Sequence, residues 1–331
     1  MAVATEQGQV VEELRSAEKL LLTTHENPDG DALGSLLGMH WILQQLGKDS
    51  LMYMSPDEFP LPWEYRDWTF DGLAGVPPAD MDERTVVFLD CGNIDRMPVD
   101  FLQRDGIHIV NVDHHHDNTR FGTVNLVAPE ASCTAEIVWR LAKEMGAEIT
   151  PPIADALYVG LVTDTGRFMY ENTSAEAHRM ASELIEAGVQ PHLTYRRLFE
   201  GLPLRRLQLL QRALASVETH LDGAITIASL NKEDYLETGG LETDSEGIVD
   251  HMRAVEGTKV AVLVRELLGD ERRGRRKVSL RATDGEVDVS SIARSLGGGG
   301  HRQAAGFTTE LGPDELVATL REQVAAQLQA A

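Results

Sequence analysis

Short apolar runs alternate with longer amphipathic stretches through the first half of the chain. The short runs are rich in Leu, Val and Ile, which is typical of buried strands, and the longer stretches carry apolar residues at helical spacing. Strands that alternate with helices indicate β-α-β units, so the pattern predicts an α/β fold with a mostly parallel, Rossmann-like sheet. We expect strands at 19–24, 50–55, 86–89 and 107–112, and helices at 31–46, 135–145, 153–162 and 174–187.

The pattern changes after Pro191. Residues 193–218 are helix-rich and charged, which suits a connector, and strand character then begins again. We therefore predict a first domain at 1–190, a helical linker at 191–220 and a smaller α/β domain at 221–331. In the last of these we expect strands at 224–230, 259–267, 277–283 and around Phe307, and helices at 245–255, at 289–296 and from Pro313 onward.

Composition and charge narrow the class of protein. The 331 residues carry a formal net charge of −23, which argues against non-specific binding to a long polyanion. An anionic substrate is still compatible with this negative charge, because bound divalent cations reverse the sign of the electrostatic potential around them. The chain has no apolar run long enough for a membrane span, its first residues do not resemble a secretory signal, and its two cysteines form no C-x-x-C pair. We expect a cytoplasmic protein with free thiols and no membrane association.

Acidic and imidazole side chains follow three of the predicted strands. His25, Asp29 and Asp31 follow the first, Asp90 ends the third, and Asp113-His114-His115 ends the fourth. The carboxyl ends of parallel strands share one edge of the sheet, where ligands bind in open α/β folds. The alternatives are that Asp31 caps a helix and that backbone amides after Cys91 satisfy Asp90. Convergence of all these side chains at one edge favours a metal centre.

Adjacent residues in the Asp113-His114-His115 run cannot all face one atom. One histidine can bind a metal while the other faces the substrate. Asp113 can orient one of the two imidazoles through a hydrogen bond without binding the metal itself. Asp164 follows an apolar helical stretch and adds a further carboxylate. A mixed set of histidine and aspartate ligands favours manganese or a similar ion, with magnesium as the alternative.

Two features of the second domain could contact an anion. The run Gly297-Gly-Gly-Gly-His301 allows close backbone approach, its amides can cradle an anion, and His301 adds a donor. The basic segment at 272–277 fits two interpretations equally well, a solvated hairpin tip or a phosphate-binding loop.

Together these segments resemble the DHH phosphoesterase family with its associated C-terminal domain. The matching motifs are His25-Glu-Asn-Pro-Asp-Gly-Asp31, Leu89-Asp-Cys-Gly-Asn93, Val112-Asp-His-His115, Thr163-Asp-Thr-Gly166 and the GGGGH run ending at His301. The resemblance covers residues 19–320. The two-domain length of the chain is similar to that of the oligoribonuclease/pAp-phosphatase branch.

The resemblance implies a role for each residue at these motifs. It implies that His25, Asp29 and Asp90 hold one divalent cation, and that Asp31, Asp90, His114 and Asp164 hold another, with Asp90 bridging. It further implies that His115 contacts the scissile phosphate. It implies that a terminal phosphate or nucleotide is bound by Arg281, Ser290, Gly298, Gly299, Gly300 and His301.

The resemblance also implies the activity and its alternatives. It implies a metal-dependent phosphodiesterase and phosphatase that acts on short RNA or DNA oligonucleotides, pApA and pAp, by in-line attack of an activated water on phosphorus. It also implies a homodimer. Hydrolysis of cyclic di-AMP and a RecJ-like single-strand exonuclease activity are the nearest alternatives. A non-catalytic nucleotide-binding module is a further alternative, but it would predict lost ligand positions, and all are filled here.

Overall fold

The computed structural model describes residues 5–104 and 106–330 and divides the chain into two compact units. Unit 1 is Met1–Glu200 and unit 2 is Gly201–Ala331. Residues 1–4, part of the N-terminus that does not resemble a secretory signal, lie outside the described residues. The expected linker contains α7 (Pro191–Phe199) in unit 1 and α8 (Leu204–Ala215) in unit 2. Its role as a linker stays a prediction.

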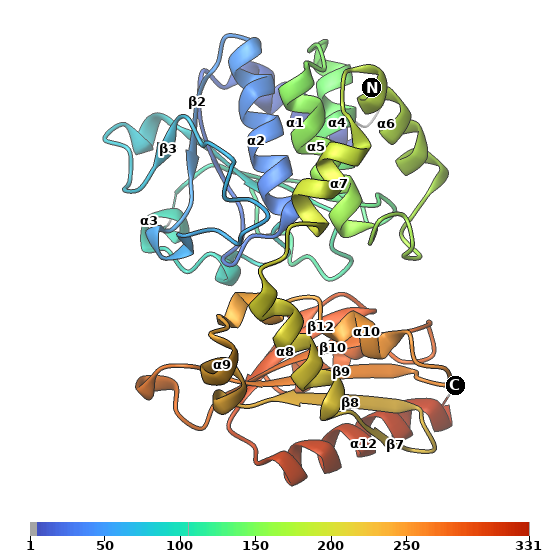
Figure 1. The fold of residues 1–331 in the computed structure, drawn as a ribbon. Coiled ribbons are helices and arrows are strands. Elements are labelled where there is room, and N and C mark those ends of the chain that lie inside the picture. Colours follow the sequence, from blue (N-terminus) through green and yellow to red (C-terminus); the bar gives the residue numbers. More distant parts are fainter. Residues whose placement is uncertain (1–4, 105, 331) are drawn as a thin grey trace. The chain divides into compact units, whose positions relative to one another are not determined.

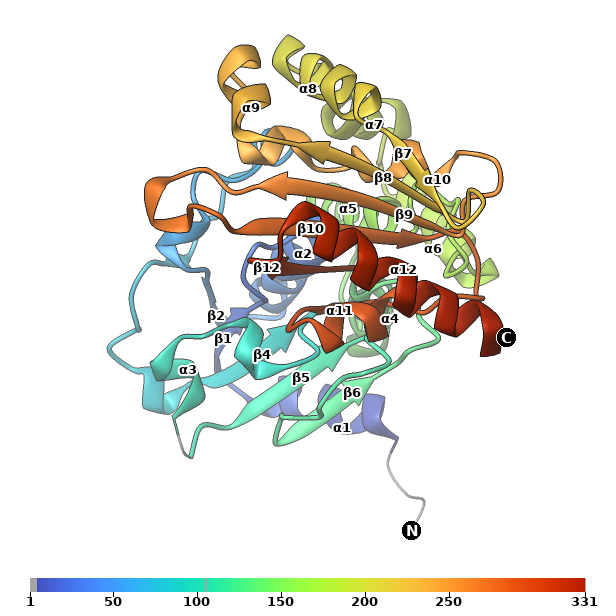
Figure 2. The ribbon, with the colours of Figure 1, turned by 90° about the horizontal axis from the view of Figure 1, so that it is seen from below.

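Unit 1 is built on a six-stranded sheet in the order β3-β2-β1-β4-β5-β6. Each neighbouring pair of strands is parallel, which confirms the predicted parallel sheet. Figure 2 shows β1, β4, β5 and β6 side by side. The strands are β1 (Lys19–Thr23), β2 (Asp49–Tyr53), β3 (Leu73–Ala74), β4 (Thr85–Leu89), β5 (Ile109–Asp113) and β6 (Val124–Val127).

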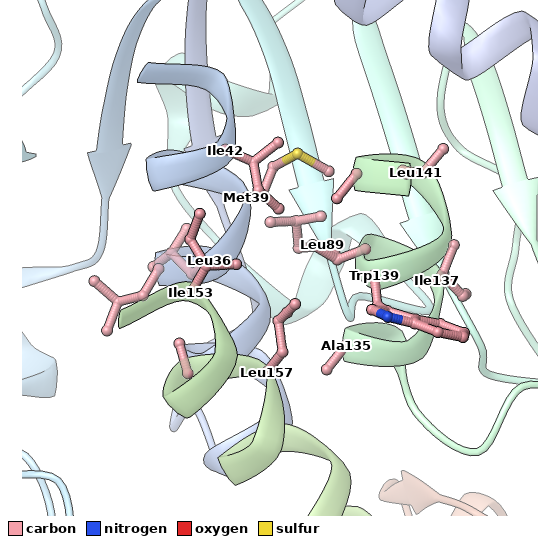
Figure 3. Packing of buried hydrophobic residues seen from close by; sticks show 14 of the residues in the cluster. Leu36, Met39, Ile42, Leu89, Ala135, Ile137, Trp139, Leu141, Ile153 and Leu157 are labelled. Atoms are coloured by element: carbon pink, nitrogen blue, oxygen red, sulfur yellow. The ribbon is translucent and has the colours of Figure 1, made fainter. Parts of the chain in front are cut away.

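Three buried helices of unit 1, α2, α4 and α5, pack against one another and against the sheet (Figures 1 and 3). Leu36, Ile42, Leu89 and Leu157 are fully buried in this core. The contact between α2 and α5 is close enough that a Cβ at Gly34 would lie 2.3 Å from the carbonyl oxygen of Ala156 on α5. The helices of unit 1 are α1 (Glu6–Ser16), α2 (Gly30–Gln45), α3 (Asp100–Gln103), α4 (Thr134–Met145), α5 (Pro151–Asp164), α6 (Ala175–Glu186) and α7.

The sequence pattern missed several elements of unit 1, notably α1 and β6. These two pack against each other at the end of the sheet, and α1 buries Val10, Val11 and Leu14. Its apolar face is narrow, and β6 is an edge strand with partly exposed residues. Neither therefore gives the strong periodic signal of a fully buried element.

Unit 2 contains a second six-stranded sheet, in the order β11-β12-β10-β9-β8-β7. Strands β8 and β9 are parallel and the other pairs are antiparallel, so this sheet is mixed. One face packs on α11 and α12, and the other packs on α8, α9 and α10. The strands are β7 (Glu218–His220), β8 (Ile225–Leu230), β9 (Val260–Glu266), β10 (Arg276–Ala282), β11 (Gly299–Gly300) and β12 (Ala304–Thr309). The other helices are α9 (Lys232–Thr238), α10 (Val249–Arg253), α11 (Val289–Ser295) and α12 (Pro313–Ala330).

The basic segment at 272–277 spans the end of the connection between the antiparallel strands β9 and β10 and the first two residues of β10. The guanidinium of Arg272 donates to both carboxylate oxygens of Glu242, and that of Arg276 donates to the carbonyl of Leu311. These contacts favour the hairpin-tip interpretation. Cys91 and Cys133 are buried free thiols. In the part of the chain that the structure describes, no helix has both the length and the apolar character that a membrane crossing requires.

Candidate metal centre

The candidate metal centre lies at the carboxyl edge of the sheet of unit 1, where β1, β4 and β5 end. These three strands are neighbours in the sheet and run parallel. His25 follows β1 in the loop that leads to α2, Asp90 comes directly after β4, and Asp113 is the last residue of β5. Parallel pairing therefore brings side chains that are far apart in sequence to one edge.

The loop between β1 and α2 fixes His25 and Asp29. The Nδ1 atom of His25 lies 2.7 Å from the carbonyl of Glu26, which favours a proton on Nδ1. The Nε2 atom of His25 lies 3.6 Å from Asp90 Oδ2. Asp29 is the N-cap of α2, and its Oδ1 accepts from the amides of Asp31 and Ala32. Asp29 can cap the helix through Oδ1 and offer Oδ2 to a cation.

Asp31 is held by a helix other than its own. Its Oδ2 accepts from the amide of Thr134 at 2.7 Å, and its Oδ1 accepts from the amide of Ala135 at 2.9 Å. These are the first amides of α4, so the Asp31 carboxylate occupies the N-terminus of that helix. The N-cap of α2 is Asp29, so Asp31 caps α4 instead of its own helix. This role is compatible with a ligand role for the same carboxylate.

Asp90 lies between the histidines in a left-handed backbone conformation. Its φ is +58°, a conformation that Asp and Asn tolerate better than other residues with side chains, and it is 2% exposed. Asp90 Oδ1 accepts from the hydroxyl of Thr134 at 3.0 Å and lies 3.6 Å from His114 Nε2. Since Oδ2 faces His25, the two oxygens of Asp90 face two different groups of ligands.

The two neighbouring histidines have different surroundings. His114 Nε2 lies 3.6 Å from Asp164 Oδ2 and 4.0 Å from Asp31 Oδ2, among the carboxylates. His115 instead places Nδ1 2.7 Å from Asp113 Oδ1. Asn118 holds the second oxygen of Asp113 at 2.6 Å. Asp113 therefore orients the ring of His115.

Asp164 is the last residue of α5. Its carboxylate accepts from Asn172 Nδ2 at 3.2 Å, and the same amide nitrogen donates to the carbonyl of Ser132 at 2.8 Å. Asn172 thus connects the end of α5 to the loop before α4. It fixes the orientation of a carboxylate that would otherwise lie at a free helix end.

The charges at this edge are unevenly balanced. Burial and the carboxylates of Asp90 and Asp164 raise the pKa of Asp31 well above its usual value. Burial raises the pKa of Asp164 to about 7, against the opposing charge of His114 and with increases from Asp29 and Asp90. Burial acts in the same direction on Asp90, but the three histidines around it lower its pKa below the usual range. Crowded, buried carboxylates of this kind are stabilised by bound cations.

The donor atoms fall into groups that fit divalent ions. His25, Asp29 and Asp90 form one group and Asp31, His114 and Asp164 form another, with the donor atoms of each group within 4.8 Å of one another. Asp90 also groups with Asp113 and His115 at the same spacing. Mixed imidazole and carboxylate donors suit manganese, iron, cobalt or zinc better than magnesium. The residues predicted as metal ligands thus lie together at one edge.

The glycine run in unit 2 leads from the turn after α11 into the edge strand β11. A Cβ at Gly298 would lie 2.1 Å from the carbonyl oxygen of Gly306, and one at Gly300 would lie 2.5 Å from that of Ala304. At Gly299 a Cβ would meet nothing within 4 Å. Gly298 and Gly300 therefore permit close strand packing, whereas Gly299 faces open space. His301 follows in a tight turn closed by mutual backbone bonds with Ala304.

Arg281 lies beside this turn, since it pairs with Ala304 in the β10–β12 register. Its Nε atom is 3.3 Å from Asp250 Oδ1. Ser290, in contrast, is fully buried in α11, where its hydroxyl contacts Asp288 and accepts from Arg294. Substrate binding by Ser290 stays a prediction, and its visible contacts are those of a helix terminus.

Sequence reasoning missed the residues that hold the ligands in place. Thr134, Asn118 and Asn172 all donate to carboxylates of the site. Asn118 stands five residues after Asp113 and could have been considered as a local partner. The contacts of Thr134 with Asp31 and Asp90 span 103 and 44 residues, and no local pattern indicates them.

Comparison with known proteins agrees with this geometry. The N-terminal domain model of the DHH family matches residues 19–161, and the DHHA1 domain model matches residues 230–330. The bifunctional oligoribonuclease and PAP phosphatase NrnA of Thermus thermophilus is 36% identical over 308 residues, which cover 90% of this chain and 87% of that protein.

Two crystal structures share the fold. An exopolyphosphatase-related protein from Bacteroides fragilis is similar with a TM-score of 0.84 at 24% identity, and the match covers 100% of this chain and 99% of that chain. RecJ of Thermus thermophilus in complex with Mn²⁺ is similar with a TM-score of 0.55 at 14% identity, and the match covers 98% of this chain and 54% of that chain.

Proposed function

This chain belongs to the DHH family of phosphoesterases, and on that premise we propose that it hydrolyses short oligoribonucleotides and pAp. It is a hydrolase of phosphoester bonds. The observation that carries the substrate class is the 36% identity to the Thermus oligoribonuclease and PAP phosphatase, which extends over 90% of the chain and so includes both units.

We propose that unit 1 holds two divalent cations. His25, Asp29 and Asp90 hold one, and Asp31, Asp90, His114 and Asp164 hold the other. Asp90 bridges them, because its two oxygens face the two groups. His114 is assigned as the ligand because it lies among carboxylates, whereas Nδ1 of His115 is engaged by Asp113. The bound cations would activate the attacking water and offset charge on the phosphate. The mixed donor set favours Mn²⁺.

His115 is assigned to the scissile phosphate. Burial alone would lower its pKa, but the carboxylates of Asp113 and Asp90 raise it to about 9. With Nδ1 held by Asp113, the imidazolium form of His115 can donate to a phosphate oxygen. In unit 2 we assign Arg281, Gly299 and His301 to the terminal phosphate. Arg281 on β10 pairs with Ala304 on β12, Gly299 on β11 pairs with Gly306 on the same strand and has an open backbone position, and His301 follows β11 directly.

The substrate class is tested by comparing turnover of pAp, pApA, a five-nucleotide RNA, a 24-nucleotide RNA and cyclic di-AMP at a fixed Mn²⁺ concentration. Turnover of pAp and the short RNAs well above the others would support the proposal. Equal or faster cleavage of cyclic di-AMP would make the chain a cyclic-dinucleotide phosphodiesterase. Fast degradation of the 24-nucleotide RNA would favour the RecJ-like exonuclease.

Mn²⁺ is expected to raise the melting temperature of the protein and to release protons when it binds. The pKa of Asp164 is about 7, so this carboxylate is partly protonated at neutral pH and must lose its proton to coordinate a cation. Affinity should therefore rise as pH increases through about 7. Calorimetric titration at pH 6.5 in two buffers of different ionisation enthalpy measures the proton count. Binding without proton release would contradict the ligand role of Asp164.

Replacement of His301 by alanine is expected to raise KM for pAp with little change in Mn²⁺ affinity. Loss of a charge-assisted hydrogen bond costs about 1.5–3 kcal/mol, or roughly 10- to 100-fold in binding. Steady-state kinetics and Mn²⁺ titration of the same variant separate the two effects. An equal fall in Mn²⁺ affinity would show that our division of roles between the units is wrong.

Two wider expectations also belong to this proposal. A homodimer follows from the family resemblance, and a cytoplasmic location follows from the composition and the buried free thiols. Sedimentation analysis of the purified chain tests the first, and fractionation of the producing cell tests the second.

A further inference from the structure

Thr134 contacts two of the proposed metal ligands at once, although no motif includes it. It is the first residue of α4 and is fully buried. Its amide donates to Asp31 Oδ2 at 2.7 Å, and its hydroxyl donates to Asp90 Oδ1 at 3.0 Å. Asp31 is a proposed ligand of one cation, and Asp90 is the proposed bridge. A single residue thus joins both carboxylates.

The start of α4 explains why this contact forms. The N-cap residue is Cys133, whose side chain accepts no hydrogen bond from the helix. The first amides of α4 therefore take the Asp31 carboxylate as their acceptor, supplied by α2. This arrangement fixes the position of Thr134, and its hydroxyl then reaches Asp90 in the loop after β4.

The direction of the Thr134–Asp90 bond is determined by chemistry. An ionised carboxylate can only accept, so the hydroxyl hydrogen must point to Asp90 Oδ1. The same oxygen lies 3.6 Å from His114 Nε2, on the side of the second ligand group. The bond therefore restrains the rotation of the Asp90 carboxylate while one oxygen faces each group. Loss of a hydrogen bond that orients a metal ligand typically lowers metal affinity or activity by about 10- to 100-fold.

We infer that Thr134 is a positioning residue of the metal centre, which holds Asp31 through its amide and Asp90 through its hydroxyl. The inference rests on the proposed metal dependence of the enzyme. Substitution can remove only the hydroxyl. The hydrogen bond from the backbone amide at position 134 to Asp31 persists with any residue other than proline.

The test compares two variants of Thr134 with a matched control. Thr134→Val keeps the shape and removes the hydroxyl, whereas Thr134→Ser keeps the hydroxyl and removes a methyl group. The control is Thr194→Val, which removes a buried threonine hydroxyl that donates to Asp155 at 3.1 Å in the same unit, outside the ligand groups. Mn²⁺ affinity is measured by calorimetric titration, melting temperature is measured without metal, and pAp kinetics are measured at limiting and at saturating Mn²⁺.

Thr134→Val is expected to weaken Mn²⁺ binding by about 10- to 100-fold. Thr134→Ser and Thr194→Val are expected to bind Mn²⁺ as the wild type does, whatever their melting temperatures. Saturating Mn²⁺ should restore part of the lost kcat of Thr134→Val and leave KM for pAp unchanged.

Two outcomes would overturn the inference. Wild-type Mn²⁺ affinity in Thr134→Val would show that the hydroxyl does not position Asp90. Equal weakening in Thr134→Val and Thr134→Ser would assign the effect to packing instead of the hydroxyl. Failure of the wild type itself to bind Mn²⁺ would overturn the proposed metal dependence, and is distinguishable because it precedes any comparison of variants.

Discussion

Replacement of Asp90 by asparagine is expected to reduce Mn²⁺-dependent hydrolysis of pAp by about 1,000-fold or more, which corresponds to about 4 kcal/mol of transition-state stabilisation. The two carboxylate oxygens of Asp90 face different ligand groups, His25 on one side and His114 on the other. A neutral amide can offer only one oxygen and no charge. Both proposed cation positions should weaken together.

Asparagine is the appropriate substitute because of the backbone at this position. The φ of Asp90 is +58°, and asparagine tolerates this left-handed region whereas alanine would add strain. The fold should therefore persist, with a far-ultraviolet circular dichroism spectrum like that of the wild type. A change of about 1 kcal/mol in the free energy of unfolding would shift the melting temperature by only about 2–4 °C in a domain of this size.

A matched control comes from the same unit. Asp155 on α5 accepts from Thr194 and Arg197 and belongs to neither ligand group, so Asp155→Asn removes an equal charge away from the site. It should retain nearly full activity. If Asp90→Asn kept more than a tenth of the wild-type rate, or lost no more activity than Asp155→Asn, the bridging role of Asp90 would be wrong.

Replacement of Gly160 by alanine is expected to lower both stability and Mn²⁺ affinity. A Cβ at this position of α5 would lie 2.7 Å from the Cβ of Ala135 and 2.8 Å from Asp31 Oδ1. Overpacking of a dense core costs about 1–3 kcal/mol, which exceeds the gain of about 1 kcal/mol from alanine in a helix interior. The Asp31 carboxylate must shift, and its bonds to the start of α4 should weaken with it.

Gly38→Ala provides the comparison, because Gly38 lies in the same α2–α5 contact but away from the ligands. A Cβ there would lie 2.7 Å from Cδ2 of Leu157, a buried apolar side chain, and not beside a ligand carboxylate. Thermal unfolding without metal gives the packing cost of each variant, and Mn²⁺ titration gives the effect on the site. We expect about a 10-fold or larger loss of affinity for Gly160→Ala only. Equal affinities for the two variants would show that Asp31 is not fixed by this contact.

The sequence by itself determined the framework of the site. Alternating apolar runs and amphipathic stretches predicted the parallel sheet, and the structure confirms it. Because parallel strands share a carboxyl edge, the positions of His25, Asp90 and Asp113 after three predicted strands were enough to place them together. The motifs around these residues also indicated the DHH family, which the comparisons show. Periodic patterns and motifs involve residues that are close in sequence, so they can be recognised without knowledge of the tertiary packing.

Tertiary structure alone decided how the ligands are held. Adjacent histidines are equivalent in sequence, but Nε2 of His114 faces Asp31, Asp90 and Asp164, whereas Nδ1 of His115 faces Asp113 and Asp90. Asp31 caps α4 and not its own helix because α2 and α4 pack with the Asp31 carboxylate at the amides of Thr134 and Ala135. These bonds join residues more than 100 positions apart. They depend on helix packing at close range, which leaves no periodic pattern in the chain.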